Sequence, residues 1–533
     1  GMKDYCAENE KNASSIFGNA FLNVLRIILN QLQANLITII DSNFSEMKLI
    51  SKLIIGGSIL LLPLNSYAQI TKGLSYQAET GISFSGGEHT PFWLTANKQG
   101  LSSIEKNNGY LRAGIFRELE NDKRFSYAFG ADLAVAYNFT STFVVQQLYA
   151  DLKYRCLGVS IGSKERHSEF NNPLLSSGGL TFSGNARPVP QVRIGIPEYT
   201  IVPGTKGWLA FKGHIAYGIF TDDGWQKDFV APGNKYTEHV LYHSKDLYVK
   251  IGNREKFPLI LEGGLEMAAQ FGGNAFIGDQ KIDMPNGIKD FFKVFIPSGG
   301  GSETPTGEQT NVYGNHLGSW NFSLTWYAPQ DWTIRPYYEH YFEDHSQMFG
   351  EYGWKDCLAG IEITFPKNPV VSSFVYEYIS TKDQTSPVYW DHTPEIPEQI
   401  SGADNYYNHY IYSGWQHWGM GIGNPLVMSP IYNNDGDIVF KSNRMQGHHF
   451  GIMGNPCADL QYRILLSVTR NWGTYALPFY EIKKNGNALA ELKYMPHQLK
   501  GWDFTASLGI DRGAMLGKSA GGMLTIRKTG WIR

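Results

Sequence analysis

The sequence predicts an all-β fold, a transmembrane antiparallel β-barrel of about 16 to 18 strands with long loops and short helical loop elements. Polar and apolar residues alternate over runs that exceed the length of about 5 to 6 residues typical of soluble strands. Aromatic residues begin or end many of these runs. After Gln69 no apolar run reaches the length of about 18 residues that a transmembrane helix requires, so the chain is expected to cross a membrane with strands.

The clearest alternation lies in residues 124–137. Its odd positions are apolar, namely Phe125, Tyr127, Phe129, Ala131, Leu133, Val135 and Tyr137. Its even positions are small or polar and include Ser126 and Asp132. A strand that crosses a bilayer needs about 9 to 11 residues, apolar toward lipid and polar toward the lumen. This stretch meets both requirements.

The same alternation recurs further along the chain, in residues 144–155, 259–271, 320–327, 357–365 and 502–511. Charged residues in these runs fall almost wholly on one parity, which predicts that they face a lumen. The charged residues expected there are Glu262, Glu266, Glu362, Lys153, Arg155 and Arg463. They either line an open pore or pair with one another. Pairing is the commoner role in a barrel interior, because an unpaired charge away from bulk water is costly.

Short turns and long loops alternate between the runs. Short turns are predicted at residues 120–123, 328–331, 366–369 and 484–487. Long loops are predicted at residues 162–188, 221–242, 272–310 and 381–408. Short turns on one rim and long loops on the other are typical of bacterial outer-membrane barrels. Within the loops, residues 285–293 and 235–243 are expected to form short helices that fold over or into the barrel mouth.

Residues 47–68 have the three parts of a secretory signal peptide in the right order. Two lysines provide the positive charge, residues 53–64 the apolar segment, and residues 66–68 a small-residue cleavage site. We therefore expect residues 69–533 to form the mature outer-membrane barrel domain. Residues 1–46 are expected to be an over-extended N-terminus that is not part of the mature protein.

The composition narrows the classes of function. Only 18% of the residues are charged and the formal net charge is -3, so the composition does not indicate a nucleic-acid partner. The four cysteines show no CxxC pair, so neither a zinc site nor a disulfide framework is predicted, and no metal or cofactor is expected. The chain also lacks a GxSxG elbow, a phosphate-binding loop and a dinucleotide fingerprint, so it is not expected to be an enzyme.

Three segments carry a resemblance to a known family: residues 86–94, residues 171–180 and residues 183–192. They begin at Gly86, Asn171 and Ser183, and they resemble the Wzi family of capsule-assembly proteins. The chain looks most like the Bacteroidetes branch of that family.

The resemblance implies a large barrel of the bacterial outer membrane, exposed at the cell surface and partly closed by periplasmic or extracellular elements. It implies that the barrel binds capsular polysaccharide or exopolysaccharide and helps to assemble or retain it at the surface. Its other partners would be outer-membrane lipid and, during biogenesis, the barrel-assembly machinery.

Sugar binding requires flat apolar faces for stacking and planar polar groups for the hydroxyls. The loop residues of this kind, and hence the candidates for polysaccharide binding, are Arg187, Asp222, Asp223, Trp225, Trp390, Tyr406, Tyr407, Trp415 and Trp418. Each could instead belong to the aromatic girdles or be a solvated loop residue, because such belts are rich in Trp and Tyr.

Two other functions are compatible with the sequence. A porin-like channel for small solutes or oligosaccharides would show steady conductance in a bilayer, whereas a closed, glycan-binding barrel would not. An outer-membrane lipase or deacylase would require a Ser, a His and an acid that meet at the barrel rim.

Overall fold

The computed structural model describes residues 73–120, 123–297, 313–343, 348–349, 354–384, 388–390, 400–402 and 404–532. The predicted signal peptide and the segment before it lie outside the described residues. No helix within the described ranges is long and apolar enough to span a membrane.

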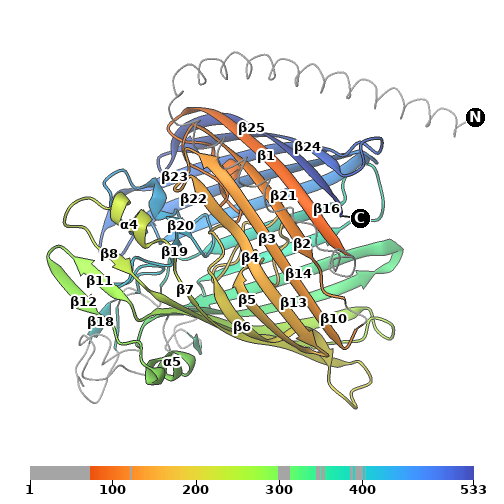
Figure 1. Cartoon of the computed structure of the whole chain (residues 1–533), viewed down its shortest axis with the longest axis horizontal. Coiled ribbons are helices and arrows are strands. Elements are labelled where there is room, and N and C mark those ends of the chain that lie inside the picture. Colours follow the sequence, from red (N-terminus) through yellow and green to blue (C-terminus); the bar gives the residue numbers. More distant parts are fainter. Residues whose placement is uncertain are drawn as a thin grey trace, which may run out of the picture. The chain divides into compact units, whose positions relative to one another are not determined.

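Eighteen strands form one closed antiparallel barrel (Figure 1). In order around the barrel they are β1 (Leu74–Gly87), β2 (Asn107–Arg117), β3 (Phe125–Tyr137), β4 (Phe143–Tyr154), β5 (Leu157–Ser163), β6 (Gln191–Ile201), β7 (Leu209–Ile219), β9 (Leu241–Ile251), β10 (Leu259–Phe271), β13 (Asn315–Ala328), β14 (Trp332–Phe342), β15 (Cys357–Thr364), β16 (Ser373–Ser380), β21 (Met445–Cys457), β22 (Leu460–Gly473), β23 (Pro478–Tyr494), β24 (Trp502–Gly513) and β25 (Gly517–Trp531). β1 closes the barrel, because it pairs with β2 on one side and with the last strand, β25, on the other. The predicted fold class and number of strands are confirmed.

The loops carry short elements of their own. These are α3 (Phe92–Thr95), α4 (Asp223–Phe229), β8 (Tyr236–Glu238), β11 (Asn274–Ile277), β12 (Gln280–Asp283), α5 (Ile288–Phe295), η3 (Pro329–Asp331), β17 (Val388–Trp390), β18 (Ile400–Gly402), β19 (Gln416–His417), β20 (Met420–Gly421) and η4 (Pro430–Tyr432).

The side chains of the wall follow the predicted alternation. In β3 the odd positions point outward, and Phe125 is 58% exposed and Tyr137 60% exposed. The even positions point inward, and Ser126 and Asp132 are buried. Leu508 of β24 is likewise exposed on the outer surface. The wall therefore has an apolar exterior, which is the surface that lipid tails cover in membrane barrels.

The connections differ between the two rims. On one rim the strands join through short turns, such as the two residues between β4 and β5 and the η3 turn between β13 and β14. On the other rim lie the long connections, which include those from β5 to β6, from β10 to β13 and from β16 to β21. The predicted separation of short turns from long loops is confirmed.

One predicted turn is wrong. Residues 484–487 lie inside β23, where they pair with β22 on one side and partly with β24 on the other. The side chains of Asn485 and Asn487 point into the lumen, where the Asn485 amide donates to Asn487 and the Asn487 amide donates to Asp511 over 2.6 Å. Because these side chains satisfy each other, the Asn-Gly-Asn sequence can continue a strand instead of reversing the chain.

The two expected loop helices have different outcomes. Residues 285–293 do contain a helix, α5, although it packs on the outside of the wall: the hydroxyl of Tyr217, an outward residue of β7, donates to the carbonyl of Phe291 over 2.9 Å. Residues 235–243 contain no helix, because β8 pairs with β11 there and β9 then begins at Leu241.

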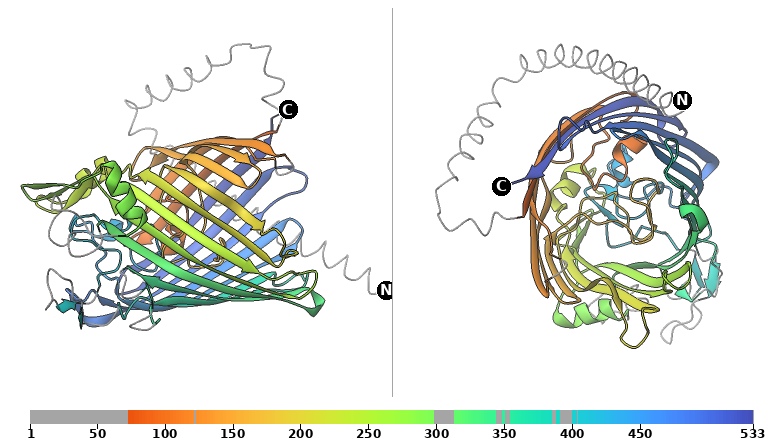
Figure 2. Two further views of the ribbon diagram at one scale, coloured as in Figure 1. Left: turned by 90° about the horizontal axis from the view of Figure 1, so that it is seen from below. Right: turned by 90° about the vertical axis from the view of Figure 1, so that its right-hand side faces the viewer.

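Three loop segments fold into the lumen and are called the plug here: residues 88–106, 164–190 and 404–444. The view along the barrel axis in the right panel of Figure 2 shows this chain inside the ring of strands. The plug and the wall share one buried core. Its members in the plug include Trp93, Leu175, Leu180, Trp415 and Phe440.

Glycines on the lumen face of the wall allow the plug to approach closely. A Cβ added at Gly451 of β21 would lie 2.4 Å from the carbonyl oxygen of Leu175, and one at Gly509 of β24 would lie 2.6 Å from Cβ of Pro91. Any larger residue would displace the plug backbone at Gly451 and the proline ring of Pro91 at Gly509.

Candidate functional site

Two carboxylates of the wall hold the plug in place. Glu377 of β16 accepts hydrogen bonds from Ser176 Oγ over 2.5 Å, from the backbone N–H and hydroxyl of Ser177 over 2.8 and 2.6 Å, and from Tyr337 Oη over 2.6 Å. Glu339 of β14 accepts from the backbone N–H of Leu180 over 2.8 Å. Both glutamates are buried. This segment is the Asn171-to-Leu180 motif of the sequence, which therefore has a structural role as an anchor.

The other two motif segments also attach to the lumen. In the segment that begins at Gly86, the backbone N–H of Phe92 donates to Asp511 of β24 over 2.7 Å, and the indole of Trp93 donates to Ser467 of β22 over 3.2 Å. In the segment that begins at Ser183, the amide of Asn185 donates to the carbonyl of Gly421 over 2.9 Å. All three motifs thus fix plug segments to the wall or to one another.

Five of the predicted site residues come together beside the β19–β20 hairpin. The guanidinium of Arg187 lies over the ring of Trp418, 4.3 Å from its centroid. The carboxylate of Asp222 accepts the backbone N–H of Trp418 over 3.1 Å. Asp223 begins α4, and Trp225 of this helix packs so closely on the hairpin that a Cβ at Gly419 would lie 2.6 Å from the indole. The cluster joins a cation, two carboxylates and two indoles. Arg187, Asp222 and Trp225 are buried, so the members with exposed surface are Asp223 and Trp418.

The electrostatics of this cluster are set by burial. Burial lowers the pKa of Arg187 to about 10. Its Nη atoms donate to Ser141 over 3.0 Å and Thr140 over 2.8 Å, and within the described part of the chain it forms no ion pair. Burial raises the pKa of Asp223 and lowers that of His417, whose Nδ1 bonds to the carbonyl of Arg187 over 2.9 Å.

Three further predicted residues lie in the core of the plug. Tyr406, Tyr407 and Trp415 are buried. The indole of Trp415 donates to the carbonyl of Thr181 over 2.9 Å, and the hydroxyl of Tyr406 donates to Asp356 over 3.0 Å. These rings therefore pack the plug and present no open face for a sugar. The side chain of Trp390, at the end of β17, lies outside the described residues.

The luminal charges predicted from the alternation are mostly paired. Arg463 lies 2.9 Å from Glu491, Glu362 pairs with Arg335, and Lys153 lies 3.2 Å from Glu198. Of the remaining carboxylates, Glu262 accepts from Ser323 over 3.2 Å and Glu266 from Tyr248 over 3.4 Å.

Arg155 is the exception among these predicted luminal charges. It lies exposed in the turn between β4 and β5 with a φ of 54°, above the ring of Tyr154. The reversal of the chain interrupts the alternation at this point, so the parity of the strand does not extend to Arg155.

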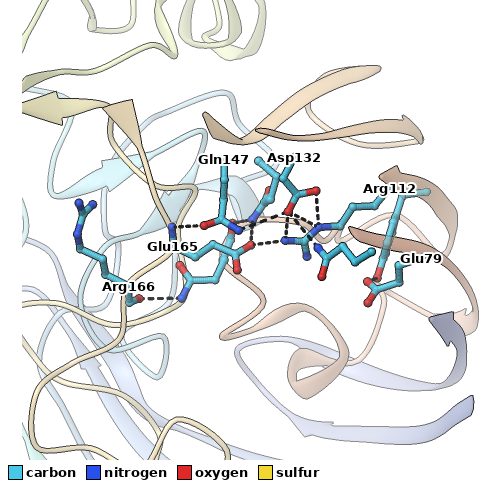
Figure 3. A network of polar contacts seen from close by, with 10 residues as sticks. Glu79, Arg112, Asp132, Gln147, Glu165 and Arg166 are labelled. Atoms are coloured by element: carbon cyan, nitrogen blue, oxygen red, sulfur yellow. Dashed lines mark hydrogen bonds and ion pairs between the residues drawn. The ribbon is translucent and has the colours of Figure 1, made fainter. Parts of the chain in front are cut away.

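A second set of ion pairs joins the wall to the plug. Arg112 of β2 lies 2.5 Å from Asp132 of β3 and 2.8 Å from Glu165 of the plug (Figure 3). Gln147 of β4 accepts the backbone N–H of Glu165 over 3.1 Å. In Figure 3 the side chain of Arg166, the next residue, points away from this network.

A cavity of about 440 Å³ lies in the lumen between plug residues 164–190 and the inner face of the wall from β4 to β10. Arg166, Arg193, Asp246 and Glu266 are among the residues that line it. Its volume falls within the range of about 300 to 1,000 Å³ that is usual for small-molecule sites. The alternation predicted that Glu266 of the wall faces the lumen, but no motif indicated that the plug would enclose a cavity beside it.

Comparison with known proteins bears on the fold. No family model and no curated protein sequence matches the chain. Among solved structures, Wzi of Escherichia coli, described as an outer membrane protein involved in group 1 capsule assembly and a carbohydrate-binding β-barrel, is similar with a TM-score of 0.53 and 13% identity, over 87% of this chain and 89% of that chain. The chain has the fold of an outer-membrane β-barrel.

Other barrels align over similar lengths. The outer membrane protein OprD of Pseudomonas aeruginosa aligns with a TM-score of 0.43 and 9% identity, over 86% of this chain and 94% of that chain. OccAB3 of Acinetobacter baumannii aligns with a TM-score of 0.42 and 8% identity, over 86% of this chain and 99% of that chain. The predicted resemblance is confirmed for the fold, while the Bacteroidetes branch stays a prediction.

Proposed function

We propose that the protein is a barrel of the bacterial outer membrane that binds a capsular polysaccharide or exopolysaccharide and helps to assemble or hold it at the cell surface. The observation that carries this proposal is the plug, which folds into the lumen with a packed core and is anchored to the wall by Glu377 and Glu339. A diffusion channel needs an open path, whereas a plugged barrel can present its loops and the groups between them to a polymer.

The cluster beside the β19–β20 hairpin is the proposed contact for the polymer. Trp418 is the partly exposed ring of this cluster and stacks with Arg187. An indole face that is held by a cation on one side can pack against a sugar ring on the other. Asp223, whose side chain is partly exposed, would accept bonds from sugar hydroxyls, whereas the buried Asp222 would hold Trp418 in position.

Two experiments test this function. Deletion of the gene should release capsule into the medium without stopping synthesis of the polymer, as measured by the cell-attached and free fractions. Unchanged cell-attached capsule would contradict the proposal. In planar bilayers the purified barrel should show no steady conductance, and an open pore would instead support the porin-like alternative.

A further inference from the structure

Three polar side chains of the barrel wall meet at the luminal cavity. His214 lies on β7, and Ser244 and Asp246 lie two residues apart on the neighbouring strand β9. His214 and Asp246 are directly paired across the two strands, and the two-residue spacing places Ser244 on the same inner face. All three residues are buried or nearly so, and all three line the cavity.

The distances place the imidazole between the hydroxyl and the carboxylate. Nε2 of His214 is 2.9 Å from Oγ of Ser244, and Nδ1 of His214 is 2.8 Å from Oδ2 of Asp246. Nδ1 makes no hydrogen bond of good angle, so Asp246 acts on the imidazole through its charge at this short distance. A proton on Nδ1 leaves Nε2 free to accept the proton of the serine hydroxyl. Separations of about 2.6 to 3.2 Å between a nucleophile, its base and the group that orients the base characterise activated serines, whatever their order in the chain.

Cationic groups are available in the same cavity for charge that develops on a substrate. Arg166 donates to Ser160 Oγ over 3.0 Å and to the carbonyl of Lys164 over 3.2 Å, and within the described residues it forms no ion pair with a carboxylate. Arg193 lies 3.9 Å from Asp246. The backbone N–H groups of β9 are committed to the sheet, so these guanidinium groups are the donors that could stabilise an oxyanion.

We propose that Ser244, His214 and Asp246 form an ester-hydrolysing site in the barrel lumen, and that its substrate is an O-acyl ester of a sugar. The choice of a sugar ester rests on the proposed function, whereas the assignment of the three residues does not. Ser244 and His214 are the catalytic residues, Asp246 is a positioning residue, and Arg166 is assigned to the oxyanion.

The reaction balances with water as the co-reactant. Ser244 Oγ attacks the ester carbonyl carbon while its proton passes to His214 Nε2, and the negative charge on the carbonyl oxygen faces Arg166. The bond between the carbonyl carbon and the sugar oxygen then breaks, and His214 returns the proton to that oxygen. Water attacks the acyl-serine by the same route, which releases the carboxylic acid and restores Ser244.

The chain provides its own matched control. His449 of β21 is also a buried luminal histidine bonded to a serine, with its Nδ1 2.7 Å from Ser467 Oγ. Its Nε2 faces the carbonyl of Leu175 over 2.8 Å, where a carboxylate would be needed to complete the same arrangement. Ser467 should therefore be unreactive although its hydroxyl contacts an imidazole.

The test is covalent labelling of the folded, full-length barrel with a fluorophosphonate, followed by mass spectrometry of the labelled peptide. We expect labelling at Ser244, its loss in Ser244→Ala and His214→Gln, and unchanged labelling in Ser467→Ala. The heat-dependent shift in electrophoretic mobility confirms that each variant is folded. An unlabelled Ser244 in the unmodified barrel, or equal labelling of Ser244→Ala, would overturn the proposal.

Hydrolysis assays then separate the site from its substrate. With p-nitrophenyl acetate, Asp246→Asn should lower kcat by on the order of 100-fold or more at an unchanged KM. Arg166→Gln should lower kcat by about 100-fold. Wild-type kcat in either variant would remove the role assigned to that residue.

Release of acetate from O-acetylated xylan supports a sugar ester as the substrate. Hydrolysis of p-nitrophenyl acetate alone overturns the sugar ester and leaves the three-residue site standing, while the capsule measurement tests the binding function separately.

Discussion

Glu377 shows how a single wall residue can hold the plug in the lumen. Its carboxylate receives four hydrogen bonds, of which three come from Ser176 and Ser177 of the plug. Hydrogen bonds to a charged acceptor are stronger than neutral ones, and a buried carboxylate that lost them would be left without solvation.

The first prediction concerns this anchor. Glu377→Gln should lower the free energy of unfolding by about 2 kcal/mol or more, because an amide cannot accept from all of these donors. Denaturant titration of the purified barrel measures the change. Glu255→Gln is the control, since Glu255 lies exposed in the turn between β9 and β10. An equal effect of the two substitutions would mean that the anchor contributes nothing specific.

The second prediction concerns acid and rests on His409 in the plug. Burial and the nearby Lys235 lower the pKa of His409 to about 3, and its Nδ1 accepts the backbone N–H of Ile411 over 3.1 Å. In the unfolded chain His409 takes up a proton near pH 6.5, whereas in the folded protein it stays neutral until about pH 3. The contribution of neutral His409 to the stability of the fold is therefore complete above pH 6.5 and decreases as the pH falls toward 3.

Thermal unfolding measured from pH 7.5 down to pH 4.5 tests this sign. The unfolding temperature of the wild type should fall with pH, and His409→Gln should reduce that dependence. A His409→Gln variant with the same pH dependence as the wild type would show that another group governs it.

At the scale of elements, α5 changes the character of the outer surface of the wall. On the side that the helix covers, Tyr217, His243 and Lys245 point outward, and the ring of Phe291 packs 5.0 Å from that of Tyr217. The ammonium of Lys245 donates to the carbonyl of Phe295. The helix thus satisfies the hydroxyl of Tyr217 and the ammonium of Lys245, which would otherwise face lipid.

The opposite side of α5 is apolar. Ile288, Phe292 and Ile296 are exposed by 79%, 69% and 67%. Their spacing of four residues places them along one stripe, so the helix continues the apolar exterior of the barrel over the covered polar patch.

The third prediction follows from this stripe. Phe292→Asp should decrease the folded fraction in lipid vesicles, because a charge replaces a ring whose burial contributes about 1.5 to 3 kcal/mol. The folded fraction is read from the electrophoretic mobility of unheated samples. Leu477→Asp is the matched control, since Leu477 is 78% exposed in the loop between β22 and β23 and away from α5. Equal losses in both variants would contradict a role for the stripe in lipid contact.

At the scale of the whole molecule, the wall and the plug are held together by different kinds of interaction. The wall is held by the continuous ladder of eighteen strands. The plug is held by side chains that reach across the lumen, such as Glu339 and Asp511. The closed ladder should therefore survive the removal of plug segments.

The fourth prediction tests this independence. Replacing residues 382–443 with a short Gly-Ser linker should leave a heat-resistant barrel and produce a steady conductance in planar bilayers. The unmodified barrel measured under the same conditions is the reference. A deletion variant that folds but does not conduct would show that residues 88–106 and 164–190 close the lumen by themselves.

The sequence indicated the wall well because a wall strand has a local rule. One face must be apolar and the other polar or small, so a run such as residues 125–137 reveals its own orientation. The rule fails where contacts with distant parts of the chain determine whether a segment turns or continues as a strand. Residues 484–487 have turn chemistry but lie in a strand, and Arg155 has luminal parity but lies in a turn.

The amino-acid sequence by itself determined a closed strand barrel with an apolar exterior, because alternation is a property of neighbouring residues. Only the tertiary structure decided that the lumen is plugged, that Tyr406, Tyr407 and Trp415 are buried there, and that Ser244, His214 and Asp246 meet at one cavity. These features join residues that lie far apart in the chain, as in the bond from Phe92 to Asp511, which are 419 positions apart. No local pattern records such contacts, since they depend on which strands and loops the closed barrel brings face to face.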